Sequence, residues 1–145
     1  MRLGVAATPW VALPTLDWLS SSEHELALVI TQPDRPAGRG RSVRKSAVGE
    51  WAHAHNVPVV KPELSLDLLR ELDGLDLVIT IGYGVILPIA VLSIPRFGFI
   101  NLHFSLLPAW RGAAPVARAI LNGNTTSGVS VFQLDAGMDT GPIFV

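Results

Sequence analysis

The sequence predicts an α/β protein with a mostly parallel, three-layer α/β/α sheet, because short apolar strands alternate with helical segments along the chain. Residues 75–81 are apolar apart from Asp76 and Thr80, which is typical of a strand buried on both faces. A length of 145 residues fits a single domain. The expected strands are residues 3–7, 26–31, 57–60, 75–81, 97–104, 129–134 and 142–145.

The segments between these strands carry helix signals. Thr8 and Pro9 fit an N-cap followed by proline in the first turn, so a helix should run toward Ser20. Pro14 either kinks this helix or marks its true start. Residues 33–43 are rich in proline, glycine and arginine and are expected to lack regular structure. The other expected helices are residues 45–56, 64–72, 88–92 and 112–122.

The composition excludes cysteine-based sites and raises the question of why so few residues are charged. The chain has no cysteine, which rules out disulfides and thiolate metal sites. Only 16% of its residues are charged, against roughly 25% in an average soluble domain. Either the chain spans a membrane, or later parts of the protein cover some of its surface. Residues 77–95 lack charge, but Gly82, Gly84 and Pro88 interrupt them, which favours a strand, a turn and a short helix.

We therefore expect residues 1–145 to be one domain that is incomplete at its C-terminal end. Charge is also unevenly distributed along it. Residues 34–45 contain five basic and one acidic residue, whereas the remainder has six basic and eleven acidic residues. Such a segment is often merely solvated, but an isolated basic loop shaped by glycine and proline also suits phosphate contact.

The candidate catalytic residues follow the strand expected at residues 97–104. Asn101 and His103 are two positions apart, so both side chains should emerge on one face. An amide donor beside an imidazole suits a developing oxyanion, and a carboxylate can orient the imidazole and favour its charged form. Asp139 is the natural carboxylate, whereas Asp135 can instead fix a turn. No Gly-x-Gly-x-x-Gly or P-loop pattern is present, which disfavours a dinucleotide or nucleotide site.

Two motifs resemble the hallmarks of the folate-dependent formyltransferase family: Asn101-Leu-His-Phe-Ser-Leu-Leu-Pro108 and Leu134-Asp-Ala-Gly-Met-Asp-Thr-Gly141. Residues 32–40 and 111–115 resemble segments of the family members that act on methionyl-tRNA. The resemblance implies a Rossmann-like formyltransferase fold in the N-terminal, folate-binding catalytic domain. It also implies transfer of the formyl group of 10-formyltetrahydrofolate to the α-amine of initiator methionyl-tRNA, without a metal.

The resemblance assigns roles residue by residue. Asn101, His103 and Asp139 are the implied catalytic group. The implied folate contacts are Tyr83, Gly84, Ile86, Leu87, Pro88, Ser105, Leu106, Leu107, Pro108 and Asp135. The implied nucleic-acid contacts are Arg35, Arg39 and Arg41.

Two alternatives remain at this level. One is another enzyme that uses 10-formyltetrahydrofolate, either a formyltransferase acting on a sugar nucleotide or purine precursor, or a hydrolase. The other is a non-catalytic folate- or RNA-binding fragment. The expected location is cytoplasmic for a bacterial protein, or an organelle matrix for a eukaryotic one, with neither a membrane nor a protein partner.

Overall fold

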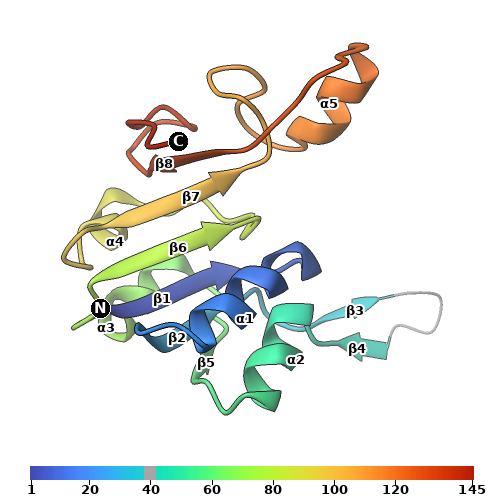
Figure 1. The fold of residues 1–145 in the computed structure, drawn as a ribbon. Coiled ribbons are helices and arrows are strands. Elements are labelled where there is room, and N and C mark those ends of the chain that lie inside the picture. Colours follow the sequence, from blue (N-terminus) through green and yellow to red (C-terminus); the bar gives the residue numbers. More distant parts are fainter. Residues whose placement is uncertain (38–41) are drawn as a thin grey trace.

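The computed structural model describes residues 1–37 and 42–145, and its centre is a six-stranded sheet in the order β5-β2-β1-β6-β7-β8 (Figure 1). All neighbouring pairs are parallel except β7 and β8, which are antiparallel. This arrangement confirms the predicted mostly parallel sheet. The strands are β1 (Arg2–Ala7), β2 (Glu25–Ile30), β5 (Val59–Val60), β6 (Leu77–Ile81), β7 (Phe99–His103) and β8 (Ser130–Gln133).

Helices cover both faces of the sheet, which confirms the three layers (Figure 1). On one face α1 (Leu13–Ser20) and α2 (Ala47–Ala54) pack in a buried cluster that includes Val5 of β1. On the other face α3 (Leu68–Glu71) and α4 (Ile89–Leu92) pack in a second cluster that includes Ala6. Neighbouring residues of β1 therefore enter opposite cores, as the two-residue period of a strand requires. Short 3₁₀ turns, η1 (Trp10–Ala12) and η2 (Ser65–Asp67), precede α1 and α3, and α5 (Pro115–Leu121) lies beyond the end of β7.

The start of the first helix corrects one prediction. A 3₁₀ turn occupies Trp10–Ala12, and α1 begins at Leu13 with Pro14 in its first turn. The prediction that Pro14 marks the true start is therefore confirmed, and the expected N-cap at Thr8 is wrong. The Thr8 hydroxyl instead donates a hydrogen bond to the backbone carbonyl of Tyr83.

The segment expected to lack regular structure contains two strands. β3 (Arg35–Ala37) and β4 (Ser42–Arg44) pair antiparallel as a separate two-stranded sheet, which lies apart from the large sheet in Figure 1. Pro36 stands at the centre of β3, opposite Val43. Proline is tolerated there because each strand of a two-stranded sheet is an edge, so a missing N–H breaks no central ladder.

Two apolar runs gave different outcomes, a correction at residues 142–145 and a confirmed prediction at residues 77–95. Residues 142–145, expected to be a strand, form only an isolated bridge between Phe132 and Ile143 and a few backbone hydrogen bonds to Val131 and Gln133. Residues 77–95, which raised the membrane question, form β6, a turn and α4. Across the described parts of the chain, no helix combines the length and apolar character needed to cross a membrane.

Candidate active site

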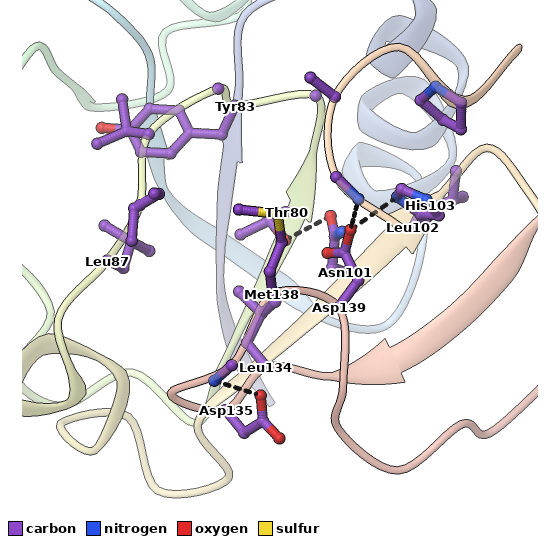
Figure 2. Close-up of a pocket in the computed structure, with 18 of the residues that line it drawn as sticks. Thr80, Tyr83, Leu87, Asn101, Leu102, His103, Leu134, Asp135, Met138 and Asp139 are labelled. Atoms are coloured by element: carbon purple, nitrogen blue, oxygen red, sulfur yellow. Dashed lines mark hydrogen bonds and ion pairs between the residues drawn. The ribbon is translucent and has the colours of Figure 1, made fainter. Parts of the chain in front are cut away.

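A cavity of about 620 Å³ opens at the carboxyl ends of β6 and β7 (Figure 2). Open α/β sheets bind ligands at this edge, and the volume lies within the usual range of small-molecule sites. Its walls come from residues 82–87, the end of β7, residues 112–115 and the loop 134–139. In Figure 2, Tyr83 and Leu87 lie at one side of this cavity, and Asn101, His103 and Asp139 lie at the other. We call it the β6–β7 cavity.

Asn101 reaches the cavity from β7, and a residue of β6 holds its side chain. Thr80 is the Cα partner of Asn101 across the parallel β6–β7 pair. The Thr80 hydroxyl lies 2.8 Å from Oδ1 of Asn101 and 3.1 Å from the carbonyl oxygen of Ile100 (Figure 2). Asn101 therefore has a buried neighbour that contacts one end of its amide.

His103 is only 6% exposed and has a polar neighbour at each ring nitrogen. Nε2 lies 3.0 Å from the carbonyl oxygen of Trp110, which can only accept a hydrogen bond, so Nε2 carries the proton. Nδ1 lies 3.7 Å from Oδ2 of Asp139. The edge of the imidazole also packs near Phe132, with the two rings almost perpendicular. The ring therefore has a defined orientation, with Nε2 directed at the Trp110 carbonyl and Nδ1 directed at Asp139.

Asp139 is held by a backbone amide. Oδ2 accepts a hydrogen bond of 2.6 Å from the N–H of Gly112, and the same oxygen faces His103. Asp139 and Trp110 both have positive φ angles, 52° and 60°, which non-glycine residues seldom adopt. Such conformations persist where the surroundings over-determine them, and here both residues contact His103.

Asp135 has a different role in the structure. Its Oδ1 accepts hydrogen bonds from the N–H of Gly137 at 2.9 Å and from the hydroxyl of Thr140 at 2.8 Å. These bonds fix the loop that carries Asp139. Asp135 also lines the β6–β7 cavity, so it both shapes the loop and faces the ligand space.

The apolar side of the cavity includes most of the predicted folate contacts in this segment. Burial raises the pKa of the Tyr83 phenol above its ordinary value, so this group stays neutral at physiological pH. The side-chain amide of Gln32 donates a 2.8 Å hydrogen bond to the Tyr83 carbonyl. Pro88 is not among the lining residues. The predicted contacts that do line the cavity here are Tyr83, Gly84, Ile86 and Leu87.

The structure does not bring the predicted Ser105–Pro108 segment into the cavity. The Ser105 hydroxyl donates to the carbonyl of Ala109 at 2.6 Å, and the Leu107 N–H donates to the Ser130 hydroxyl at 3.1 Å. These bonds brace the loop that presents the Trp110 carbonyl to His103. The four predicted folate contacts that lie outside the cavity lining are Ser105, Leu106, Leu107 and Pro108.

The predicted nucleic-acid residues are partly within the described structure. Arg35 begins β3 and is exposed, and Arg44 is its Cα partner on β4. Arg39 and Arg41 lie outside the described residues.

Sequence reasoning missed Thr80 and Gly112, the two residues that hold Asn101 and Asp139. A threonine within an apolar strand is ordinary, because β-branched residues favour strands, so nothing singled out Thr80. Gly112 lay within a recognised motif, but its role depends on a backbone N–H, which residue identity does not reveal.

Comparison with known proteins identifies similarities over nearly the whole chain. The family model described as formyl transferase matches residues 5–145. A methionyl-tRNA formyltransferase of Salinispora tropica is 52% identical over 99% of this chain and 48% of its own length. One from Legionella pneumophila strain Paris is 53% identical over 95% of this chain and 45% of its own length. The chain thus spans about half the length of these curated relatives.

Solved structures show the same fold. Phosphoribosylglycinamide formyltransferase from Bacillus halodurans aligns with a TM-score of 0.81 and 24% identity, covering 100% of this chain and 77% of that one. WlaRD, a sugar 3N-formyl transferase whose structure was determined in the presence of dTDP and 5-N-formyl-THF, aligns with a TM-score of 0.76 and 23% identity. That alignment covers 100% of this chain and 50% of WlaRD.

Proposed function

The chain belongs to the formyl transferase family, and on that premise we propose that residues 1–145 are the folate-binding, catalytic part of an enzyme that formylates methionyl-tRNA. The observation that carries this proposal is the similarity of almost the whole chain to proteins named methionyl-tRNA formyltransferase. The Asn101, His103 and Asp139 group in one cavity supports the catalytic part of the proposal. The reaction belongs in the compartment where translation starts, the cytoplasm in bacteria.

The β6–β7 cavity fits a folate as the formyl donor. One side offers the backbone of residues 82–84 and the aliphatic side chains of Ile86 and Leu87, which suit a flat heterocycle. The other side offers hydrogen-bonding groups at Asn101 and His103. With 10-formyltetrahydrofolate bound, the donor supplies a formyl carbon attached to a nitrogen leaving group.

The chain's own residues would then stabilise charge and move one proton. The Asn101 amide donates a hydrogen bond to the formyl oxygen, which becomes negative when the α-amine of methionyl-tRNA adds to the formyl carbon. A protonated His103, whose Nε2–H stays on the Trp110 carbonyl, offers its Nδ1–H to the same oxygen beside the Asp139 carboxylate. A carbon–nitrogen bond to the amine forms, and the bond from the formyl carbon to the folate nitrogen breaks. Asp139 orients His103 and assists the proton on its way from the amine to the departing nitrogen.

The basic segment around β3 and β4 is proposed to contact tRNA phosphates. Arg35 stands opposite Arg44 on the paired strand, so two positive residues lie close at one sheet end. A phosphate bound by basic residues of this segment would release counterions. Arg39 and Arg41 lie between these strands in the sequence and are proposed as further contacts.

The direct test is an assay of the complete gene product with 10-formyltetrahydrofolate and three acceptors. These are methionyl-tRNA, an amino-sugar nucleotide and glycinamide ribonucleotide. We expect formyl transfer to methionyl-tRNA at a kcat/KM at least about 100-fold above that for either other acceptor, a ratio within reach of a site whose polar groups the wrong acceptor leaves unpaired. Preferred transfer to a small acceptor, or folate binding without transfer to any of the three, would refute the proposal.

A further inference from the structure

We propose that Thr80 is a positioning residue that orients the Asn101 amide so that its N–H groups face the β6–β7 cavity. The proposal rests on the formyl-transfer function proposed above, since it is the formyl oxygen that needs a donor at this position. Thr80 lies on β6 and is 4% exposed. It acts through Asn101 rather than on the substrate.

The geometry of the pair is the basis for this role. The Thr80 hydroxyl lies 2.8 Å from Oδ1 of Asn101, a good distance for an O–H to O hydrogen bond. Among the described residues, this is the only hydrogen bond of the Asn101 side chain. When Oδ1 accepts this bond, the amide nitrogen at the other end of the planar group points away from Thr80. Because Asn101 lines the cavity, this orientation makes its N–H groups available to a ligand there.

The hydroxyl has one proton but two acceptors within reach, and the choice between them has opposite consequences. If the proton went to the Ile100 carbonyl at 3.1 Å, the Thr80 oxygen could only accept from Asn101. The amide would then turn its NH₂ group toward Thr80 and present an oxygen to the cavity, which repels a developing oxyanion. The shorter contact, 2.8 Å to Oδ1, favours the arrangement that presents a donor.

Substitution of Thr80 tests this arrangement in the complete gene product. Thr80→Val removes the hydroxyl and keeps the branched shape, whereas Thr80→Ser keeps the hydroxyl. We expect Thr80→Val to lower kcat roughly five- to tenfold, the scale of one net buried hydrogen bond, with KM for the folate within about twofold of wild type. Thr80→Ser should stay within about threefold of the wild-type kcat.

A matched control separates orientation from loss of a buried hydroxyl. Thr31 is also fully buried and its hydroxyl bonds the Ser46 hydroxyl at 2.7 Å, but it does not line the β6–β7 cavity. Thr31→Val should therefore leave kcat unchanged. In an Asn101→Ala background, Thr80→Val should cause no further loss, because the group that Thr80 orients is gone.

A spectroscopic readout keeps this test independent of the proposed activity. The side-chain NH₂ signals of Asn101, assigned by their loss in Asn101→Ala, should shift or broaden in Thr80→Val and stay in place in Thr31→Val. If wild type shows no formyl transfer, the proposed function fails while this spectral change still supports the orientation. Unchanged Asn101 signals in Thr80→Val, an unchanged or higher kcat, or an equal loss in the Asn101→Ala background would each overturn the role of Thr80.

Discussion

The β6–β7 cavity and the two-stranded β3–β4 sheet differ in how their polar groups are held. In the cavity, Asn101, His103 and Asp139 each contact a fixed neighbour: the Thr80 hydroxyl, the Trp110 carbonyl and the Gly112 N–H respectively. In the β3–β4 sheet, two basic residues, Arg35 and Arg44, are Cα partners across the strands.

The two regions also differ in how firmly their strands are held by neighbouring strands. β6 and β7 are interior strands of the six-stranded sheet, whereas β3 and β4 pair only with each other. A two-stranded hairpin has little stability alone. Its base is tied down by the ion pair between Lys61 and Asp34, at 2.6 Å, next to the start of β3. The cavity is therefore organised before a ligand arrives, whereas the basic sheet is suited to a partner that supplies negative charge.

The largest expected effect comes from breaking the organised region. Asn101→Ala or His103→Ala should each lower kcat by roughly 10²–10³, the scale of removing an oxyanion donor. The double variant should lose much less than the product of the two single losses, because the residues act as one unit. Folate affinity, measured by calorimetry, serves as the control and should change far less than kcat. Near-normal turnover of His103→Ala would contradict the catalytic role.

Removing positive charge from the β3–β4 segment should give a smaller effect, and it should change the affinity for methionyl-tRNA rather than kcat. Arg35→Ala, and the Arg39→Ala/Arg41→Ala pair, should weaken methionyl-tRNA binding. The slope of log affinity against log salt should flatten by about 0.9 for each duplex phosphate that the variant no longer neutralises. Arg70→Ala offers a control, since it removes the same charge from an exposed position on α3, outside the basic segment. A salt slope equal to wild type in the Arg39/Arg41 variant would rule out phosphate binding there.

The smallest expected effect concerns Tyr83 at the apolar side of the cavity. Burial raises its pKa in the folded state, so the unfolded chain releases this proton at a lower pH than the folded chain. The resulting stability is fully present below the unfolded pKa of about 10 and is lost as pH rises through the folded pKa. Tyr83→Phe should therefore give a shallower fall of Tm between about pH 9 and about pH 11. Parallel Tm curves for the two proteins would contradict the burial effect.

The sequence allowed prediction of the large sheet and of the residues that meet at its edge, for clear physical reasons. Continuous apolar runs mark strands buried on both faces, as at β6, and the two-residue period places Asn101 and His103 together. Their roles stay a prediction. The supporting contacts could not be predicted, because Thr80 meets Asn101 only through the register of two strands that are distant in sequence.

Local sequence patterns could not reveal two features that depend on which segments pack together. Proline and glycine suggested a loop where β3 and β4 form, because local composition does not show that an edge strand tolerates proline. Ser105–Pro108 was assigned to the folate from the motif, and that assignment stays a prediction, since these residues lie outside the cavity lining and Ser105 and Leu107 form hydrogen bonds within the neighbouring loops. Neither the pairing of β3 with β4 nor the hydrogen bonds of residues 105–108 can be predicted from the sequence without knowing which segments lie beside each other.

The central claim is that the cavity performs the chemistry and the basic sheet captures the acceptor. The most direct measurement determines kcat and KM for methionyl-tRNA, at saturating folate, in His103→Ala and in Arg35→Ala. We predict that His103→Ala lowers kcat with KM little changed, and that Arg35→Ala raises KM with kcat little changed. A fall in kcat in Arg35→Ala at saturating methionyl-tRNA, together with an effect on KM alone in His103→Ala, would contradict the account.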